Sequence, residues 1–164
     1  MILVSSCLLG NNVKYSGGNN LNELLAEYSR YLTPVCPEVL GGLMTPRQPA
    51  EIQGGDVQSV LAGQAKVMDK AGADVTSAFV KGAEAVLELV KDHKVRVAIL
   101  KANSPSCGNK EIYDGSFSGK RVSGDGVTAA LLAAHGVKVY SEEDINEDLL
   151  PRIIAMYMRY LVLK

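Results

Sequence analysis

The fold is decided by Val95-Arg96-Val97-Ala98-Ile99-Leu100-Lys101, a stretch in which nearly every side chain is apolar or β-branched. A strand in the middle of a parallel sheet has this character, because helices cover both faces of the sheet and bury the strand completely. The stretch is therefore expected to be a central strand of a parallel sheet.

Shorter apolar runs on either side of this strand extend the pattern. Further strands are expected over residues 2–6, 32–35 and 137–140. Helices are expected between and after them, over residues 21–31, 76–93, 127–135 and 146–163, with Asn20 as the cap of the first. Strands that alternate with helices indicate an α/β fold. We expect a single domain over residues 1–164, with a Rossmann-like parallel sheet of about four strands flanked by helices.

An irregular insertion follows the second strand and covers residues 41–74. Gly41-Gly42, Pro46, Pro49 and Gly54-Gly55 are turn signals within it. A short helix is expected over residues 57–61, and a small hairpin is expected between residues 66–68 and 74–75. A segment of this length in a compact protein usually serves as a lid or a binding loop.

Composition excludes several classes of protein. The chain has 164 residues, of which 47% are hydrophobic, and a formal net charge of -1 with a pI near 6.1. This near-neutral charge argues against binding to nucleic acid or to a membrane surface, which requires clustered Lys and Arg. The N-terminus lacks the basic and then apolar layout of a signal peptide, so a cytoplasmic protein with reduced thiols is expected. The oligomeric state is left open.

The three cysteines all stand after expected strands. Cys7 follows the first strand, Cys36 the second, and Cys107 lies in the loop after the third. The carboxyl ends of parallel strands share one edge of the sheet, where ligands bind. Three thiols that are distant in sequence are thus expected to converge there, although three unrelated buried thiols would be the plainer interpretation.

Other cysteine chemistries fit the sequence poorly. A cysteine nucleophile needs a nearby base, and the only histidines, His93 and His135, fall at expected helix C-termini. There is no Cys-x-x-Cys pair and no fourth cysteine, as a redox pair or a structural zinc site would normally require. Three thiolates on a four-iron cluster would leave one iron open as a Lewis acid, to which a soft sulfur atom could bind.

Longer motifs run through most of the chain, from residue 1 to about residue 142. They are Cys7-Leu8-Leu9-Gly10, Cys36-Pro37-Glu38-Val39-Leu40-Gly41-Gly42-Leu43, Pro46-Arg47-x-Pro49, Asp74-Val75-Thr76, Ala98-Ile99-Leu100-Lys101-x-x-Ser104-Pro105-Ser106-Cys107-Gly108, Ile112-Tyr113-Asp114-Gly115 and Gly124-x-Gly126-Val127. Together they resemble the DUF523 family, which includes the 2-thiouracil desulfidases.

The resemblance implies a [4Fe-4S] cluster held by Cys7, Cys36 and Cys107. It implies that the open iron takes the sulfur of a thiolated pyrimidine and that water replaces this sulfur, which gives uracil and sulfide without a redox change. An acidic residue and a serine act near the cluster in this family, and Glu38 and Ser104 are the matching residues. Near-neutral charge favours a free base or nucleoside over thiolated tRNA as the substrate.

Several residues near these motifs are candidates for contacting the substrate. Arg47 is expected to donate to a pyrimidine oxygen, Asn103 to read an amide edge of the ring, and Ser106 to compete with Ser104 for its role. Asp114 is an alternative base, although its place before Gly115 is typical of a turn.

Plainer interpretations stand beside these assignments. Glu38 could be a helix N-terminal carboxylate and Ser104 a turn hydroxyl. Tyr15 or Tyr113 could stack on a planar ring or simply close the core. Lys101 ends the third strand and could face the crevice or only the solvent.

Two other functions remain open at this stage. One is a non-catalytic sensor or binding protein that holds a cluster or a zinc ion. The other is a metal-independent enzyme that processes nucleosides in the same crevice.

Overall fold

A four-stranded parallel sheet forms the centre of the protein in the computed structural model, which describes residues 1–163. The strands are β1 (Ile2–Ser5), β2 (Leu32–Val35), β5 (Val97–Leu100) and β8 (Lys138–Ser141), in the order β2-β1-β5-β8. Strand β1 pairs with β2 and β5, with Ser5 opposite Val35 and Val4 opposite Ile99. The strands therefore end at nearly the same level.

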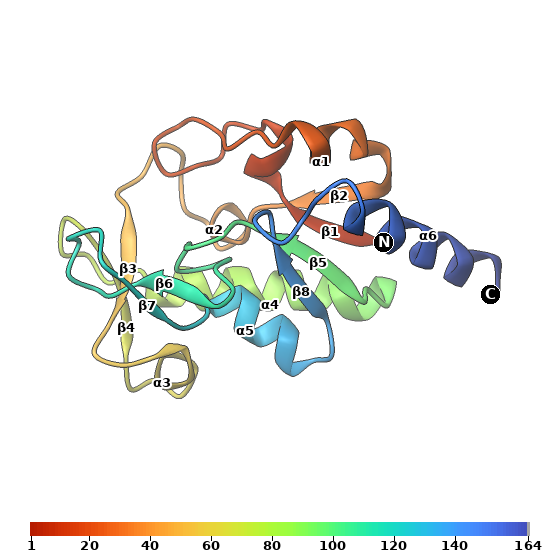
Figure 1. The fold of residues 1–164 in the computed structure, drawn as a ribbon. Coiled ribbons are helices and arrows are strands. Elements are labelled where there is room, and N and C mark those ends of the chain that lie inside the picture. The colour runs from red at the N-terminus through yellow and green to blue at the C-terminus, as the bar shows by residue number, and fades with distance from the viewer. Residues whose placement is uncertain (164) are drawn as a thin grey trace.

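Helices cover both faces of the sheet (Figure 1). On one face, Leu3 packs with residues of α4 (Thr76–His93) and α5 (Val127–Ala134). On the other face, Ile2 and Val4 pack with α1 (Glu23–Glu27) and α6 (Leu149–Val162). Successive strand residues alternate between the two faces, so each strand contributes to both cores.

Two small antiparallel hairpins lie at one side of the sheet (Figure 1). Strand β3 (Ala50–Gln53) pairs with β4 (Lys66–Asp69), and β6 (Glu111–Tyr113) pairs with β7 (Arg121–Ser123). The short helix α3 (Val57–Leu61) connects β3 to β4. Buried residues of these segments pack on Phe79 and Ala83 of α4 and form a further part of the core.

Three short helical segments complete the described structure: η1 (Ser6–Leu9), η2 (Ser29–Tyr31) and α2 (Pro37–Leu40). Helix α2 starts directly after β2 because Pro37 suits the first helical position, where a missing N–H costs nothing. Within residues 1–163, none of the helices has both the length and the apolar character needed to cross a bilayer.

The α/β fold with four parallel strands and flanking helices confirms the sequence prediction. Differences are confined to the connections. The helix predicted over residues 21–31 is shorter, and Asn22 caps it instead of Asn20, by accepting the backbone N–H of Leu25. In the insertion, residues 66–69 pair mainly with β3, and only an isolated bridge joins Met68 to Asp74. The β6–β7 hairpin was not predicted.

Helices α2 and α4 meet through two glycines. A Cβ on Gly82 would lie 1.9 Å from the carbonyl oxygen of Pro37, and one on Gly41 would lie 2.0 Å from that of Ala78. These separations are far below any contact distance, so only glycine permits this approach of the two backbones. The contact fixes α2, and with it Cys36 and Glu38, against the longest helix of the protein.

We expect Gly82→Ala to lower the free energy of unfolding by about 1–3 kcal/mol, because the added methyl group must push α2 away. An alanine would otherwise favour this helix position by roughly 1 kcal/mol. Thermal unfolding followed by circular dichroism checks the prediction, with Glu84→Ala on the exposed face of α4 as the control. Equal or higher stability of Gly82→Ala would contradict the close approach.

Candidate functional site

All three cysteines line one cavity of about 420 Å³ at the carboxyl edge of the sheet. Cys7 lies in η1 directly after β1, Cys36 precedes α2 directly after β2, and Cys107 lies in the loop after β5. All three are free thiols, and Cys107 is only 6% exposed. The convergence expected from the parallel sheet is therefore present in the structure.

Cys107 is buried, Cys7 and Cys36 are partly buried, and each of the three thiols faces a polar group. Burial raises the pKa of Cys7, and a hydrogen bond from Asn20 opposes this effect. Burial also raises the pKa of Cys36, and a hydrogen bond from the backbone N–H of Val39 has the opposite effect. Burial raises the pKa of Cys107 to about 12, and a hydrogen bond from the Ser5 hydroxyl acts in the opposite direction.

The electrostatic effects also connect the three sulfur atoms. A negative charge on Cys7 or Cys36 raises the pKa of Cys107, and one on Cys36 raises that of Cys7. This mutual effect agrees with the position of all three thiols in one cavity. Three thiolates at this site would repel each other, and a bound cation would remove that repulsion.

The donor set fits an iron–sulfur cluster better than it fits one metal ion. Across residues 1–163, no three His, Cys, Asp or Glu side chains are arranged to hold a single ion. A zinc ion would need its sulfur ligands at about 2.3 Å from a common point. In a cluster each cysteine binds a different iron atom, so the sulfur ligands stand further apart.

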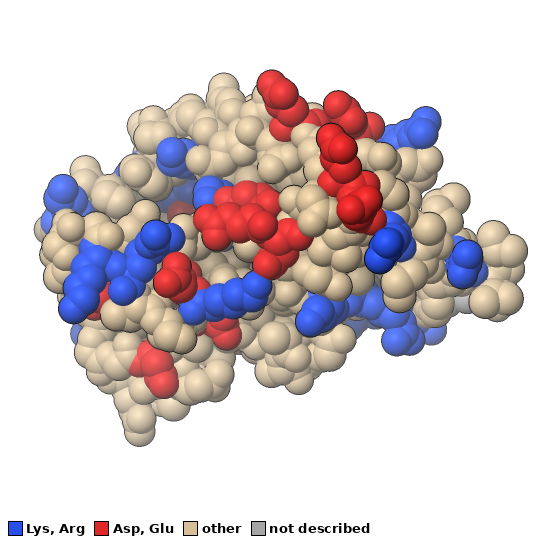
Figure 2. All heavy atoms as spheres, viewed as in Figure 1, with Lys and Arg blue, Asp and Glu red and all other residues tan. Residues whose placement is uncertain are grey.

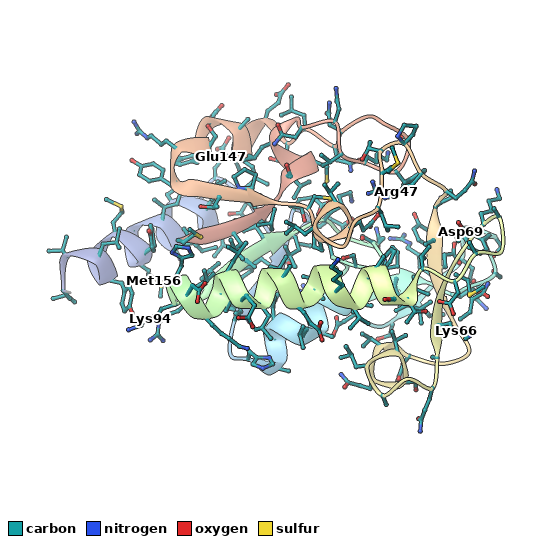
Figure 3. The ribbon with its side chains drawn as sticks, turned by 180° about the vertical axis from the view of Figure 1, so that it is seen from behind. Arg47, Lys66, Asp69, Lys94, Glu147 and Met156 are labelled. Carbon is teal, nitrogen blue, oxygen red and sulfur yellow. The ribbon has the colours of Figure 1, made fainter. Side chains whose placement is uncertain are left out.

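Glu38 and Arg47 form an ion pair in the wall of the cavity. Arg47 Nε donates to Glu38 Oε2 at 2.6 Å, and the two side chains are 11% and 16% exposed. The remaining donors of Arg47 bind the backbone oxygens of Val13 and Met44 and the Thr45 hydroxyl. Figure 3 shows Arg47 among the loops next to α2. Its guanidinium group thus joins α2 to two loops.

Ser104 lines the cavity, whereas Ser106 does not belong to its lining. Ser104 Oγ accepts the backbone N–H groups of Ser106 and Cys107, both at 3.1 Å, so its own proton remains free to be donated. Ser106 is 0% exposed, and its hydroxyl bonds to Thr128 at 3.0 Å. The structure therefore places Ser106 in the core under the loop and not at the substrate position predicted for it.

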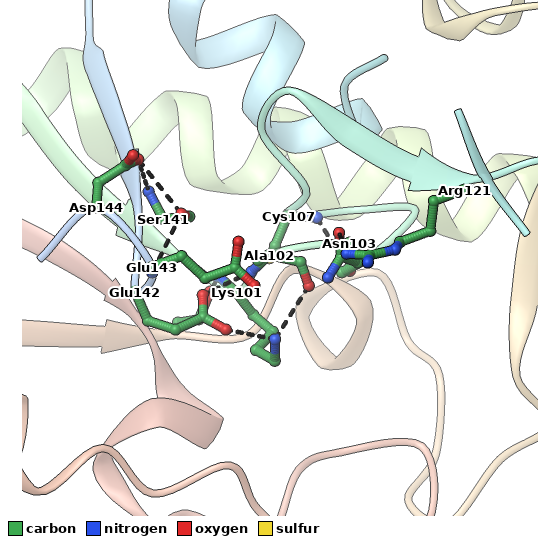
Figure 4. Close-up of polar contacts among 11 residues, drawn as sticks. Lys101, Ala102, Asn103, Cys107, Arg121, Ser141, Glu142, Glu143 and Asp144 are labelled. Carbon is green, nitrogen blue, oxygen red and sulfur yellow. Dashed lines mark hydrogen bonds and ion pairs between the residues drawn. The ribbon is translucent and has the colours of Figure 1, made fainter. Parts of the chain in front are cut away.

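Lys101 and Asn103 also line the cavity. Lys101 Nζ binds the Glu142 carboxylate and donates to the Ala102 oxygen, so this lysine is held by protein partners and is not merely solvated (Figure 4). Asn103 has a left-handed backbone with φ of 63°, and its Oδ1 accepts from Arg121 at 3.3 Å (Figure 4). Within residues 1–163 no hydrogen bond uses the side-chain NH₂ of Asn103, which can therefore bind another partner.

Tyr15 and Tyr113 line the cavity, but Asp114 does not. Asp114 accepts the backbone N–H and the hydroxyl of Ser116, and these hydrogen bonds lower its pKa. A lower pKa makes a carboxylate a weaker base. The structure therefore supports the turn-forming role of Asp114 and not the alternative role as a base.

A second hollow of about 490 Å³ lies next to strand β8 and is lined by Asn109, Lys110, Lys138 and Tyr140, among others. Lys110 is already paired with Asp144 there, and no cysteine belongs to the lining. Figure 2 shows that acidic and basic side chains mix on this face of the molecule. The thiol-lined cavity is the candidate site because it alone of these two combines thiols with an acid and a hydroxyl.

Comparison with known proteins agrees with this geometry. Residues 2–144 match the model of a family described as 2-thiouracil desulfurase. The chain belongs to the 2-thiouracil desulfurase family.

Two known proteins are similar to this member of the desulfurase family over nearly their whole length. A protein of Bacillus subtilis (strain 168), YbbK, described as uncharacterized, is 46% identical over 149 residues, which are 90% of this chain and 99% of YbbK. The solved structure of the [4Fe-4S]-dependent thiouracil desulfidase TudS, a DUF523 protein, is 40% identical. It superposes with a TM-score of 0.78 and covers 97% of each chain. The DUF523 resemblance seen in the sequence is thus confirmed.

Some residues of the cavity are not predicted from the sequence of this desulfurase-family chain. The sequence predicts Asn20 as a helix cap and Ser5 as part of a strand, whereas both bond to thiols. Glu51 and Phe117 also line the cavity, and they come from strand β3 and from the β6–β7 hairpin, neither of which was predicted. Of these residues, Ser5 had a usable signal, because it is a polar residue at the end of a buried strand next to Cys7.

We expect Cys7→Ala, Cys36→Ala and Cys107→Ala each to prevent stable binding of iron and sulfide after anaerobic reconstitution. The reason is that two thiolates cannot replace the three that the cavity supplies. Iron and sulfide assays and the visible absorption spectrum measure the effect, with Met44→Ala, at an exposed position, as the control. A full iron content in any one of the cysteine variants would remove that cysteine from the ligand set.

Proposed function

We propose that this protein is a [4Fe-4S]-dependent desulfidase that removes sulfur from a thiolated pyrimidine resembling 2-thiouracil and forms uracil and sulfide. The observation that carries the proposal is one cavity lined by Cys7, Cys36 and Cys107 together with Glu38 and Ser104. Membership of the 2-thiouracil desulfurase family and 40% identity to TudS support it.

The three cysteines would hold the cluster, which when bound supplies a Lewis-acidic iron that suits a soft sulfur atom. Asn20, the backbone N–H of Val39 and Ser5 would stabilise the thiolates by hydrogen bonds, as groups around metal ligands generally do. The polypeptide then has two tasks, which are to activate water and to orient the ring.

The proposed reaction is a hydrolysis without electron transfer. The oxygen of water bonds to the ring carbon, the carbon–sulfur bond breaks, and the sulfur leaves as hydrosulfide with the second proton of that water. Glu38 takes the proton from the attacking water as a general base. Arg47 binds Oε2 of this carboxylate and no described residue donates to Oε1, so Oε1 is the oxygen that receives the proton.

Ser104 and Asn103 are proposed to hold the ring. The Ser104 hydroxyl accepts two backbone N–H groups, which leaves its proton to donate to a ring oxygen or nitrogen. The free NH₂ of Asn103 is a second donor for a ring oxygen. Two donors at the edge of one cavity match a planar heterocycle with carbonyl and thiocarbonyl groups.

A small free heterocycle is the proposed substrate class, and the cytoplasm is the proposed compartment. The formal net charge of -1 does not favour a nucleic-acid substrate. Three free cysteines in one cavity require reducing conditions, since an oxidising compartment would promote disulfide formation.

We expect Glu38→Gln to lower kcat for the conversion of 2-thiouracil to uracil by about 10²–10⁴, because the amide cannot accept a proton at neutral pH. The iron content and visible spectrum should stay those of the wild-type protein. Turnover is measured anaerobically by chromatography of uracil, with Glu23→Gln, an exposed carboxylate of α1, as the control. Wild-type protein with a full cluster and no uracil formation would instead indicate a sensor.

The ion pair predicts that Arg47 acts through Glu38. Arg47→Met should lower kcat in the wild-type background and have little further effect in the Glu38→Gln background, because residues that act as one unit are not additive. A direct bond from Arg47 to the pyrimidine would give a different result. In that case Arg47→Met would raise KM equally in both backgrounds.

A further inference from the structure

Phe117 stands at the tip of the β6–β7 hairpin and faces the thiol-lined cavity. It is one of two phenylalanines in the chain, and the other, Phe79, is only 1% exposed. Phe117 is partly buried, and it belongs to the cavity lining together with Tyr113 and Gly119 of the same hairpin. Among residues 1–163, Phe117 belongs to none of the three apolar core clusters, and it lines the cavity instead.

The backbone of Phe117 is in an unfavourable conformation. Its φ is 56°, in the left-handed region that bulky residues seldom adopt. Such conformations persist where neighbouring groups enforce them, and they concentrate at binding sites. The tip also contains Gly115, with φ of 91°, where a Cβ would lie 2.5 Å from the Ile52 oxygen of β3. The tip is therefore pressed closely against β3 (Figure 1).

Glu51 of β3 is the group that enforces this arrangement. Its Oε2 accepts the backbone N–H of Gly115 at 2.8 Å and that of Phe117 at 3.1 Å. Gln53 adds a bond from its Nε2 to the Gly115 oxygen at 2.6 Å. Glu51 is only 7% exposed, and hydrogen bonds from N–H groups to a buried carboxylate are strong. A buried charge thus fixes the hairpin tip over the cavity.

We propose that Phe117 is a substrate-contacting residue that stacks on the planar ring of the heterocycle, and that Glu51 is the positioning residue that holds Phe117 in place. The inference rests on the proposed function, because a planar ring is what an aromatic face over this cavity would recognise. Stacking binds the ring without reading its substituents. Ser104 and Asn103 would supply the selectivity for the ring edge.

Steady-state kinetics with the anaerobically loaded protein test the stacking role. Phe117→Ala should raise KM for 2-thiouracil about tenfold, the size expected for loss of one aromatic stacking partner. Phe117→Tyr keeps the ring and should stay close to the wild-type value, as should Met156→Ala on the far α6 helix. Iron content should be the same in all of them. An unchanged KM in Phe117→Ala, with wild-type turnover intact, would overturn the inference.

The KM values of Glu51 variants test its positioning role. Glu51→Ala should raise KM as Phe117→Ala does, and the double variant should add nothing further. Glu51→Gln should restore much of the wild-type KM, because both N–H groups bind a single oxygen, which an amide also provides. A higher KM in Glu51→Gln than in Glu51→Ala would overturn this role.

A fluorescence titration separates this inference from the desulfidase proposal. The chain has no tryptophan, so Phe117→Trp introduces a single indole at the cavity. Its emission should change when uracil binds, while that of Met156→Trp, at a position 72% exposed on α6, should not. Absence of turnover in the wild type would refute the desulfidase function, whereas equal responses of the two tryptophan variants to uracil would refute the contact at Phe117.

Discussion

The candidate site depends on the parallel pairing of β1 with both β2 and β5. This register places Ser5 opposite Val35 and Val4 opposite Ile99, so the three strands finish side by side. The segments that follow them deliver Cys7, Cys36 and Cys107 to one cavity. Crossover connections make this possible, because each returns the chain to the same end of the sheet before the next strand begins. The backbone hydrogen bonds of the sheet thus bring the three cysteines close together, as closely spaced cysteines in a sequence motif do in small metal-binding domains.

Burial and hydrogen bonding have opposite effects on the pKa values of the three thiols. Desolvation favours the neutral thiol, and for Cys107 it raises the pKa to about 12. Asn20, the N–H of Val39 and Ser5 favour the thiolate instead. A cavity that partly buries its thiols and supplies donors to sulfur suits a bound cationic centre, since metal binding replaces the thiol protons and offsets the desolvation.

The sequence predicted those parts of the structure in which the pattern of apolar residues is strong. The apolar strands and helix α4 were predicted because burial against the sheet leaves a regular pattern in the residues. Strand β7 was missed because all three of its residues are exposed, so no such pattern exists. The sequence predicts Asn20 as a helix cap because its neighbours resemble a helix start. Its hydrogen bond to Cys7 cannot be predicted in this way, because the fold brings the two residues together. The sequence likewise could not show that Ser106 lies outside the cavity, because this follows from the hydrogen bond between its hydroxyl and that of Thr128.

The irregular insertion after β2 builds part of the wall of the thiol-lined cavity. It contributes Arg47, which binds Glu38 and reaches Val13, 34 residues away in the sequence. It also contributes Glu51, which binds the N–H groups of Gly115 and Phe117 across 64 and 66 residues. Both charges are largely buried, and each would be costly to bury without its partners. These partners are available only when the insertion, the first loop and the β6–β7 hairpin occupy their places together. The walls of the cavity therefore depend on one another, and the acid and the aromatic ring are placed by the same segment.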